Sequence, residues 1–498
     1  MSNPYDAVAY PGFPFLQSHP SRLCSLSTLF GLHPAPIDHC RVLELGCADG
    51  GNVIPMAFDL RGSEFLGLEL AETAVQKACR QIDALKLTNI RVEQMDLLDV
   101  EPEKLGVFDY VIAHGVYSWV PDHVREKLMA IMKACLAPEG IAYISYNALP
   151  GCRVRQMFRD MMQFHVRNVT EPEERISQSQ ELMRCFIEAY SGPNERRLFL
   201  KDEAQVMIDQ GPVLLFHDEL EETYHAIFFH DFVNHAERYG LQFVAEAHYY
   251  DMQPGRVPEA VVAQIDQFGG GNRILRDQYL DFIKCRTFRH SVLCHAGLKV
   301  LEKPQPGYVR TLHAASQAVP VSAHPSLKLG VAEEFRGTRG SAVKTAHPLA
   351  KAVLLVLTRV WPETRSFEAI CSDVRQMLGE EPDQDEIAEI LLATYTSGVI
   401  EFQARPLPCV AAVSRRPTAT ELARLQARQG KYITTTRHMS LEVDGDVERH
   451  IITLLDGTRD LPALARELAP LVRQPENIVA KEFESNLAKL AKLGMLVA

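Results

Sequence analysis

A short glycine-rich segment near the N-terminus offers the clearest chemistry in this sequence. An apolar run leads into a turn of small residues, and a helix is expected to begin near Asn52. Small residues let the backbone approach a ligand closely, and the free N–H groups of a helix start attract a carboxylate. The segment therefore predicts a site for a nucleotide-like cofactor. It reads Val42-Leu43-Glu44-Leu45-Gly46-Cys47-Ala48-Asp49-Gly50-Gly51-Asn52.

The spacing of the small residues distinguishes between cofactors. A dinucleotide fingerprint has the form G-x-G-x-x-G. Here Ala48 stands at the second glycine position, and Glu44 lies two residues before Gly46. The pattern E-x-G-x-(G/A)-x-G is instead the form that S-adenosylmethionine (SAM) sites use. We therefore expect SAM as the cofactor.

Two further acids follow at the ends of apolar runs. Glu69 lies 23 residues after Gly46, where it is placed to accept bonds from both ribose hydroxyls, and Asp96 lies 27 residues later, where it is placed to accept from the adenine amino group. Parallel strands end at one crevice, so these acids are expected to share a site. The alternative is that each merely caps a helix. The predicted cofactor-binding residues are Glu44, Gly46, Cys47, Gly50, Asn52, Glu69, Leu70, Asp96, Leu97 and His114.

Aromatic and amide side chains follow the fourth and fifth apolar runs, where a SAM enzyme opens toward its methyl acceptor. Methyl transfer needs the acceptor lone pair aligned behind the methyl group and, for an amine, deprotonated. Hydroxyls, an amide carbonyl and ring faces are suited to orienting an amine. The alternative is that the aromatic residues pack in the core and that the histidine is structural. The predicted catalytic residues are His114, Tyr117, Trp119, Tyr146 and Asn147.

Five apolar runs separated by helical patterns position these residues. Between two of them, Val75, Ala78, Ile82 and Leu85 recur at helical spacing. Strands that alternate with amphipathic helices predict a parallel sheet, so we expect an α/β, doubly wound, Rossmann-like domain. The expected strands are 42–45, 65–68, 90–95, 108–113 and 141–146.

A chain of 498 residues is too long for one ordinary core. After Arg153 the strand signal fades into helices, then a Pro- and Gly-rich connector, then two helix-and-strand units that resemble winged helices. The expected domains are 1–165, 166–302 (mainly helical), 303–405 (connector and first winged-helix-like unit) and 406–498 (second winged-helix-like unit).

Composition limits the function classes. The formal net charge is −12, and residues 406–498 hold 13 basic and 11 acidic residues, too weak an excess for a nucleic-acid footprint. No apolar run approaches a membrane span, and no secretory signal is recognised, so we expect a soluble, cytoplasmic protein. Eleven cysteines occur without a C-x-x-C pair, which favours reduced thiols. The spacing of His225, His230, Asp231 and His235 does not match one helical face, so no metal site is predicted.

The motifs resemble a known family. Residues 1–165 resemble a class I SAM-dependent methyltransferase, and the second domain resembles the "methyltransferase regulatory domain" of bacterial proteins, above all at 216–221. Similar stretches at 312–316, 345–352 and 454–459 extend the resemblance over nearly the whole chain. It also implies an N-terminal lid containing Tyr5, Tyr10, Phe15, His19 and Pro20.

The best-understood members of this family are protein-lysine N-methyltransferases that act on outer-membrane proteins of intracellular bacteria. The resemblance therefore implies methylation of lysine side chains in a protein partner. A small-molecule N- or O-methyltransferase of a biosynthetic pathway explains the first domain equally well. A DNA-binding regulator built on the winged-helix units is disfavoured by their charge, and protein docking is the preferred role for them.

Overall fold

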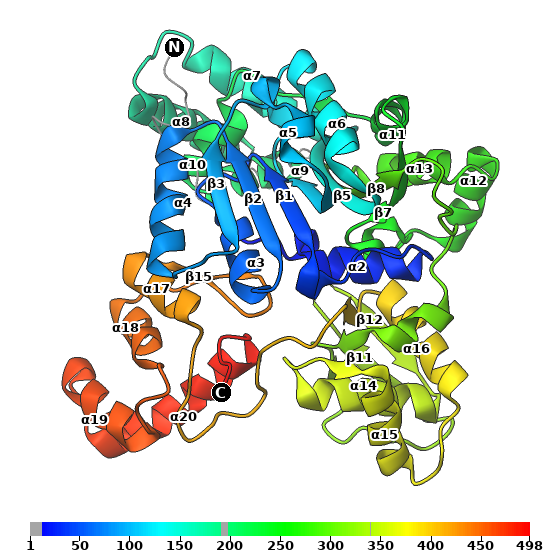
Figure 1. Cartoon of the computed structure of the whole chain (residues 1–498), viewed down its shortest axis with the longest axis vertical. Helices are drawn as coiled ribbons and strands as arrows, with labels where there is room; N and C mark the ends of the chain where they lie inside the picture. The colour runs from blue at the N-terminus through cyan, green and yellow to red at the C-terminus, as the bar shows by residue number, and fades with distance from the viewer. Residues whose placement is uncertain (1–11, 191–197, 339) are drawn as a thin grey trace.

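One large mixed sheet dominates the structure, a computed structural model that describes residues 12–190, 198–338 and 340–498. Its strand order is β3-β2-β1-β4-β5-β8-β7, and β6 pairs with β5. Strands β1 to β5 run parallel, whereas β8 is antiparallel to both β5 and β7 (Figure 1). The strands are β1 (Arg41–Leu45), β2 (Glu64–Glu69), β3 (Ile90–Gln94), β4 (Phe108–Ala113), β5 (Leu136–Ala148), β6 (Ala226–Ile227), β7 (Leu241–Glu246) and β8 (Phe288–His295).

The five expected apolar runs form strands β1 to β5, which confirms the Rossmann-like architecture. Strand β1 pairs with β2 on one side and with β4 on the other, so the chain order reverses direction at β1. In open parallel sheets such a reversal opens a crevice beyond the carboxyl ends of the strands. The sheet therefore places the glycine-rich turn after β1 at the position where ligands bind.

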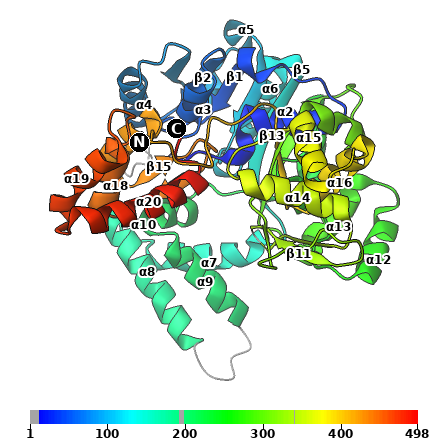
Figure 2. The same ribbon diagram turned by 90° about the horizontal axis from the view of Figure 1, so that it is seen from below.

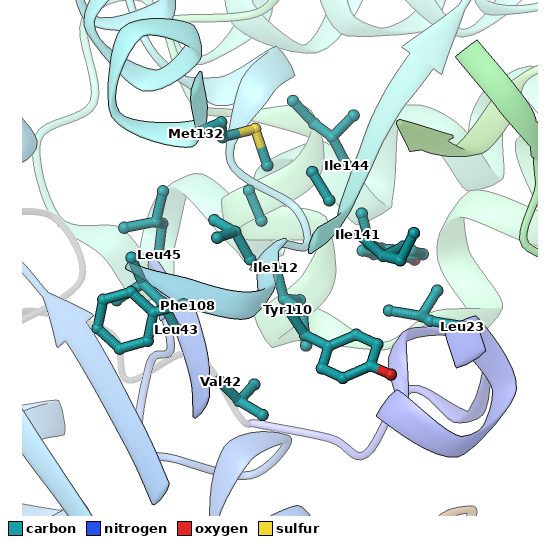
Figure 3. Close-up of a cluster of buried hydrophobic side chains, with 14 of the residues drawn as sticks. Leu23, Val42, Leu43, Leu45, Phe108, Tyr110, Ile112, Met132, Ile141 and Ile144 are labelled. Carbon is teal, nitrogen blue, oxygen red and sulfur yellow. The ribbon is translucent and has the colours of Figure 1, made fainter. Parts of the chain in front are cut away.

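The core explains why these runs are so apolar. Strands covered by helices on both faces need hydrophobic residues at successive positions rather than at every second one. Figure 3 shows aliphatic and aromatic side chains of β1, β4 and β5 packed together, with Leu23 and Met132 added from helices. Helices of this domain are α2 (Pro20–Leu29), α3 (Val53–Asp59), α4 (Glu72–Ala84), α5 (Pro102–Leu105) and α6 (Asp122–Cys135).

Residues 166–302 are mainly helical, as expected, but they also complete the main sheet. Strand β8 pairs with β5 from Ala142↔Leu293 to Asn147↔Phe288 and continues the sheet far beyond residue 165. The sequence analysis did not predict β8, because Arg289 and His290 interrupt its apolar pattern. The Arg289 guanidinium is buried against Asp281, at 2.8 Å, and Glu246, also at 2.8 Å. A buried charge needs such partners, and they allow the strand to lie inside the protein.

A helical arm branches from the end of β5. Figure 2 shows α8 and α9 projecting away from the rest of the molecule. The arm has its own hydrophobic core, which includes Phe158, Met183 and Leu215. It then returns toward the sheet through a π-helical segment, η5. These and the following helices are α7 (Cys152–His165), α8 (Pro172–Ala189), α9 (Leu198–Asp209), α10 (Pro212–Leu214), η5 (Leu215–Glu219), α11 (Phe229–Arg238), α12 (Glu259–Gly269) and α13 (Arg273–Lys284).

Two smaller units follow, each with a separate hydrophobic core. The first combines α14 (Pro348–Val360), α15 (Phe367–Leu378) and α16 (Gln384–Thr396) with short strands β9 (His313–Ala315), β13 (Arg365–Ser366) and β14 (Glu401–Gln403), beside the hairpins of β10 (Val319–Pro320), β11 (Glu333–Arg336) and β12 (Ala342–Thr345). The second contains α17 (Glu421–Gln429), β15 (Tyr432–Thr434), β16 (Ser440–Glu442), α18 (Asp446–Leu454), α19 (Leu461–Val472) and α20 (Glu476–Lys492). Within the described ranges, no helix is long and apolar enough to cross a bilayer.

Candidate functional site

A cavity of about 640 Å³ lies at the carboxyl ends of the parallel strands. Its lining follows the sheet order β2-β1-β4-β5-β8 across the molecule. Four strand spacings correspond to about 19 Å, which is room for an extended ligand and for a second molecule at one end. Along this order the lining residues are Glu69, Glu44, His114, Asn147 and Phe288.

The turn after β1 has a backbone conformation that requires a residue without a side chain at Gly46. Gly46 has φ of 73°, and a Cβ there would lie 2.5 Å from Cγ2 of Val116. A side chain at this position is therefore excluded on both conformational and steric grounds. Gly50 also has a positive φ, but its missing side chain leaves room for Ile54. Gly50 does not line the cavity, so it shapes the turn rather than facing the ligand.

Glu44 carries a buried carboxylate at the base of the cavity. Its Oε1 accepts a hydrogen bond of 2.7 Å from Nδ2 of Asn52. Its Oε2 has no hydrogen-bond partner among the described residues. Burial, reinforced by the negative charge of Glu69, raises the pKa of Glu44 to about 7. A buried acceptor with a free oxygen fits a cationic ligand, and SAM carries two positive groups on its methionine moiety.

Glu69 and Asp96 both accept backbone hydrogen bonds. The two oxygens of Glu69 receive the N–H groups of Ala48 and Ala71, each at 2.9 Å, and Asp96 caps a short turn by accepting from Leu98 at 2.9 Å. The capping role and the ligand role are compatible, because each carboxylate oxygen has a second lone pair. Leu70 and Leu97 lie on the cavity wall beside these acids, where they are suited to contact the adenine ring of a cofactor.

The N-terminal segment covers part of the cavity. The ring of Phe15 stacks on the imidazole of His114, whose Nδ1 lies 2.9 Å from the hydroxyl of Tyr143. Burial, with a smaller contribution from His290, holds the pKa of His114 well below its usual value, so this ring is neutral and a weak base at pH 7. Among the expected lid residues that the structure describes, Phe15 lines the cavity, whereas His19 and Pro20 do not. His19 caps α2 and Pro20 begins it, while Tyr5 and Tyr10 lie outside the described residues.

The predicted catalytic residues separate into two groups. Trp119 and Asn147 line the cavity with His114, and Nδ2 of Asn147 is buried without a partner among the described residues. Tyr117 and Tyr146 do not line it, which corrects their expected place at the acceptor mouth. The Tyr117 hydroxyl lies 2.7 Å from Nδ1 of His235, and the Tyr146 hydroxyl lies 3.0 Å from Oγ of Ser291.

Strand geometry explains this correction. Successive side chains of a strand point to opposite faces, so Asn147 and Tyr146 cannot both face the cavity. The ring of Tyr146 instead stacks on Phe232 of α11, with centroids 4.0 Å apart. Tyr117 contacts the same Phe232 edge-on. Both tyrosines therefore belong to the packing between the sheet and α11.

Ionisable side chains that were not predicted from the sequence line the cavity on the side of the helical arm. These residues lie in α7, in η5 and just after η5, and the motif 216–221 was noted there without a role for its acids. Burial raises the pKa of Asp218 to about 6. The guanidinium of Arg155 is held by Glu219, with Nε 2.6 Å from Oε1, and by Gln210. The lining residues from this region are Arg155, His217, Asp218 and Glu221.

The histidine-rich segment has ordinary structural roles. His235 contacts Tyr117, and both the backbone N and the ring of His230 lie 3.2 Å from the Gln278 side chain. In the part of the chain that the structure describes, no group of three or more His, Cys, Asp or Glu side chains is arranged to hold a metal ion.

Comparisons with known proteins agree with this geometry. A family model for a methyltransferase domain matches residues 43–142, one described as a predicted methyltransferase regulatory domain matches 211–295, and one for the PKMT C-terminal winged helix domain matches 415–493. The matched regulatory region contains β6, β7 and β8, so it is continuous with the main sheet.

Several relatives match by sequence or structure. The uncharacterized protein RP789 of Rickettsia prowazekii is 31% identical over 497 residues, covering 96% of this chain and 88% of the relative. PKMT2 from Rickettsia typhi, solved in complex with AdoHcy, has the same fold, with a TM-score of 0.88, 24% identity and coverage of 98% of this chain and 100% of that one. A ubiquinone biosynthesis O-methyltransferase of Acinetobacter baylyi is 27% identical over 108 residues, or 21% of this chain and 42% of its own. The chain therefore belongs to the family of RP789, and it is a SAM-dependent methyltransferase with a methyltransferase regulatory domain and a PKMT-type C-terminal winged helix.

Proposed function

We propose that this enzyme transfers the methyl group of SAM to the side-chain amine of lysine in a protein. The observation that carries the proposal is the composition of one continuous cavity. One end is lined by the cofactor motif, including Glu44 and Glu69, and the other by Asn147 of the sheet and Asp218 and Glu221 of the helical arm. A lysine side chain is a cation before it reacts, and an acidic entrance attracts it.

SAM supplies an electrophilic methyl group on a sulfonium, and residues of the first three strands would hold it. Glu69 would accept from the ribose hydroxyls, and Asp96 from the adenine amino group. The free oxygen of Glu44 would face the positive methionine end. The methyl group would then be presented to the end of the cavity that Asn147 lines.

The acceptor end has the groups that an amine needs. The carboxylates of Asp218 and Glu221 would bind the lysine as an ammonium ion. Trp119 and Phe288 would flank its aliphatic stem and exclude water. The amide oxygen of Asn147 would accept an N–H of the amine once the ammonium proton has passed to Asp218 or Glu221, which leaves the nitrogen lone pair for the methyl group. In-line alignment of this kind accounts for much of the rate in two-substrate transfer.

The relatives support a protein acceptor. The structural neighbour is named PKMT2, an abbreviation for protein-lysine methyltransferase, and AdoHcy, the demethylated product of SAM, is bound to it. The winged-helix family model at residues 415–493 carries the same name. The similar ubiquinone biosynthesis O-methyltransferase favours a small-molecule acceptor instead, but that match covers only 21% of this chain. It accounts for neither the helical arm nor the two C-terminal units.

The proposal is tested by blocking the acceptor amines. The full-length enzyme is incubated with tritiated SAM and a bacterial envelope protein fraction, half of which has been treated to acetylate its lysines. We expect label in protein bands of the untreated half and its loss in the acetylated half. Equal labelling of both halves, or label found only in small molecules, would contradict a lysine acceptor.

A further inference from the structure

Asn52 connects the cofactor site to two distant parts of the chain, the N-terminal segment and the C-terminal unit. Its side chain is buried and lies beside Glu44, which lines the cavity and has one oxygen without a hydrogen-bond partner among the described residues. The backbone N–H of Phe15 lies 2.8 Å from Oδ1 of Asn52, and Oγ of Ser18 lies 3.0 Å from its Nδ2. Nε2 of His438, which is 386 residues away in the sequence, lies 2.8 Å from Oδ1.

One contact determines which atoms in this cluster donate a hydrogen bond and which accept one. A backbone N–H is only a donor, so the atom that faces Phe15 must be the amide oxygen of Asn52. The amide nitrogen therefore faces Glu44, to which it donates a bond of 2.7 Å. The same oxygen faces His438, so Nε2 of His438 must carry the proton and donate it. The orientation of Asn52, and with it the bond to Glu44, thus depends partly on His438.

His438 is held firmly at this position. It lies in the turn between β15 and β16, where its own N–H donates to the carbonyl of Thr435 at 3.0 Å. Its φ is 55°, a left-handed conformation that costs free energy for a residue with a side chain. Burial holds the pKa of His438 well below its usual value, so the ring is neutral and has one N–H to donate.

The unit that carries His438 contacts the methyltransferase domain elsewhere as well. Leu422 of α17 is buried in the core of the main sheet domain. The ring of Tyr432 meets Phe13 edge-on, with centroids 5.0 Å apart. These contacts hold the unit in place, and His438 adds a direct contact with Asn52, the side chain that bonds to Glu44.

We propose that His438 is a positioning residue for the cofactor site, through which the C-terminal winged-helix unit controls SAM affinity. With the unit docked, His438 fixes Asn52, and Asn52 fixes Glu44 for the cationic end of SAM. When the unit is displaced, Asn52 keeps its bonds to Phe15 and Ser18 but loses the one from His438, so it holds Glu44 less firmly. Because coupling is reciprocal, bound cofactor must also favour docking of the unit. The proposal rests on the cofactor site and is independent of the identity of the methyl acceptor.

The first test measures cofactor binding in three full-length variants. His438→Phe keeps a ring but removes the donor, His438→Gln keeps a donor, and Met439→Ala changes an exposed neighbour. By calorimetry we expect His438→Phe to raise the Kd for S-adenosylhomocysteine about tenfold, the effect of one buried hydrogen bond and its unpaired partner. His438→Gln should recover most of the affinity, and Met439→Ala should match the parent. Equal affinity of His438→Phe and the parent would overturn the proposal.

The second test separates positioning from a general loss of structure. Hydrogen exchange of residues 432–442 is measured in the full-length protein with and without S-adenosylhomocysteine at saturation. The ligand should slow exchange of this hairpin in the parent and in Met439→Ala, but not in His438→Phe. Thermal unfolding without ligand shows whether His438→Phe is folded. Absence of any ligand effect on the hairpin of the parent protein would show that the two sites are not coupled.

Discussion

The ring of Phe15 lies on the imidazole of His114, with centroids 3.5 Å apart and planes inclined by 21°. One residue comes from the N-terminal segment and the other from the end of β4, so this stack closes the cavity on one side. Phe15→Ala should weaken SAM binding by about 1–2 kcal/mol, because an aromatic contact and its apolar area are lost. Calorimetry measures the effect, and Phe199→Ala, an equal truncation on exposed α9, serves as control. An unchanged Kd in Phe15→Ala would show that this segment does not cover the cofactor.

Asn147 and Tyr146 are adjacent in β5, but we predict that Asn147 aligns the acceptor and that Tyr146 stabilises the fold. Asn147→Ala should lower kcat about 100-fold while the SAM Kd stays within about twofold, because only the alignment of the acceptor is lost. Tyr146→Phe should leave kcat nearly unchanged and lower the free energy of unfolding by about 0.5–1.5 kcal/mol, since its hydroxyl pairs with Ser291. Steady-state kinetics and denaturant unfolding of both variants check this. A large kcat effect in Tyr146→Phe would return that residue to the active site.

The affinity for SAM should depend on pH through Glu44. Its pKa in the free protein is raised to about 7, so its carboxylate is mostly protonated at pH 6 and mostly ionised at pH 8. Only the ionised form attracts a cation, and the Kd for SAM should therefore rise up to about tenfold as pH falls from 8 to 6. Glu44→Gln removes the titrating group and should flatten this part of the profile. The same pH dependence in Glu44→Gln and in the parent would exclude Glu44 as its source.

Asp218 should govern acceptor binding rather than cofactor binding. Asp218→Asn removes a charge from the acceptor end, so the KM for a lysine-containing protein should rise about tenfold at low salt, with a smaller rise at high salt. Asp202→Asn, a charge removal on exposed α9, is the matched control. Since burial raises the pKa of Asp218 to about 6, the parent should also lose acceptor affinity below that pH. An unchanged acceptor KM would place the lysine elsewhere.

The parallel part of the main sheet was predictable because it rests on local patterns. Strands β1 to β5 are continuous apolar runs, and the small residues around Gly46 leave few alternatives to a tight turn. Strand β8 was not predictable, because Arg289 lies in a buried strand and its partners Asp281 and Glu246 become neighbours only in the folded protein. These contacts form only in the folded protein, so the local sequence around Arg289 does not indicate a buried strand.

The candidate site also contains some residues whose positions follow from local sequence and others whose positions do not. Glu69 is the last residue of β2, so its place in the crevice follows from the parallel topology. Tyr146 was misplaced although the alternation of side chains along a strand already sets it opposite Asn147. The contact between Asn52 and His438 joins residues 386 positions apart and has no local signature. Asp218 lay in a noted motif, but only the return of the helical arm brings it to the cavity.

The reaction proposed for this enzyme transfers the methyl group of SAM to a lysine nitrogen of a protein. The most direct measurement is mass spectrometry of the product formed by the full-length enzyme with methyl-deuterated SAM, before and after mild base treatment. An amine must lose its proton before attack, so the yield at a fixed time should rise as pH increases above 7. We predict deuterated methyl groups on lysine that survive base. Base-labile methyl groups, or label confined to small molecules, would contradict the account.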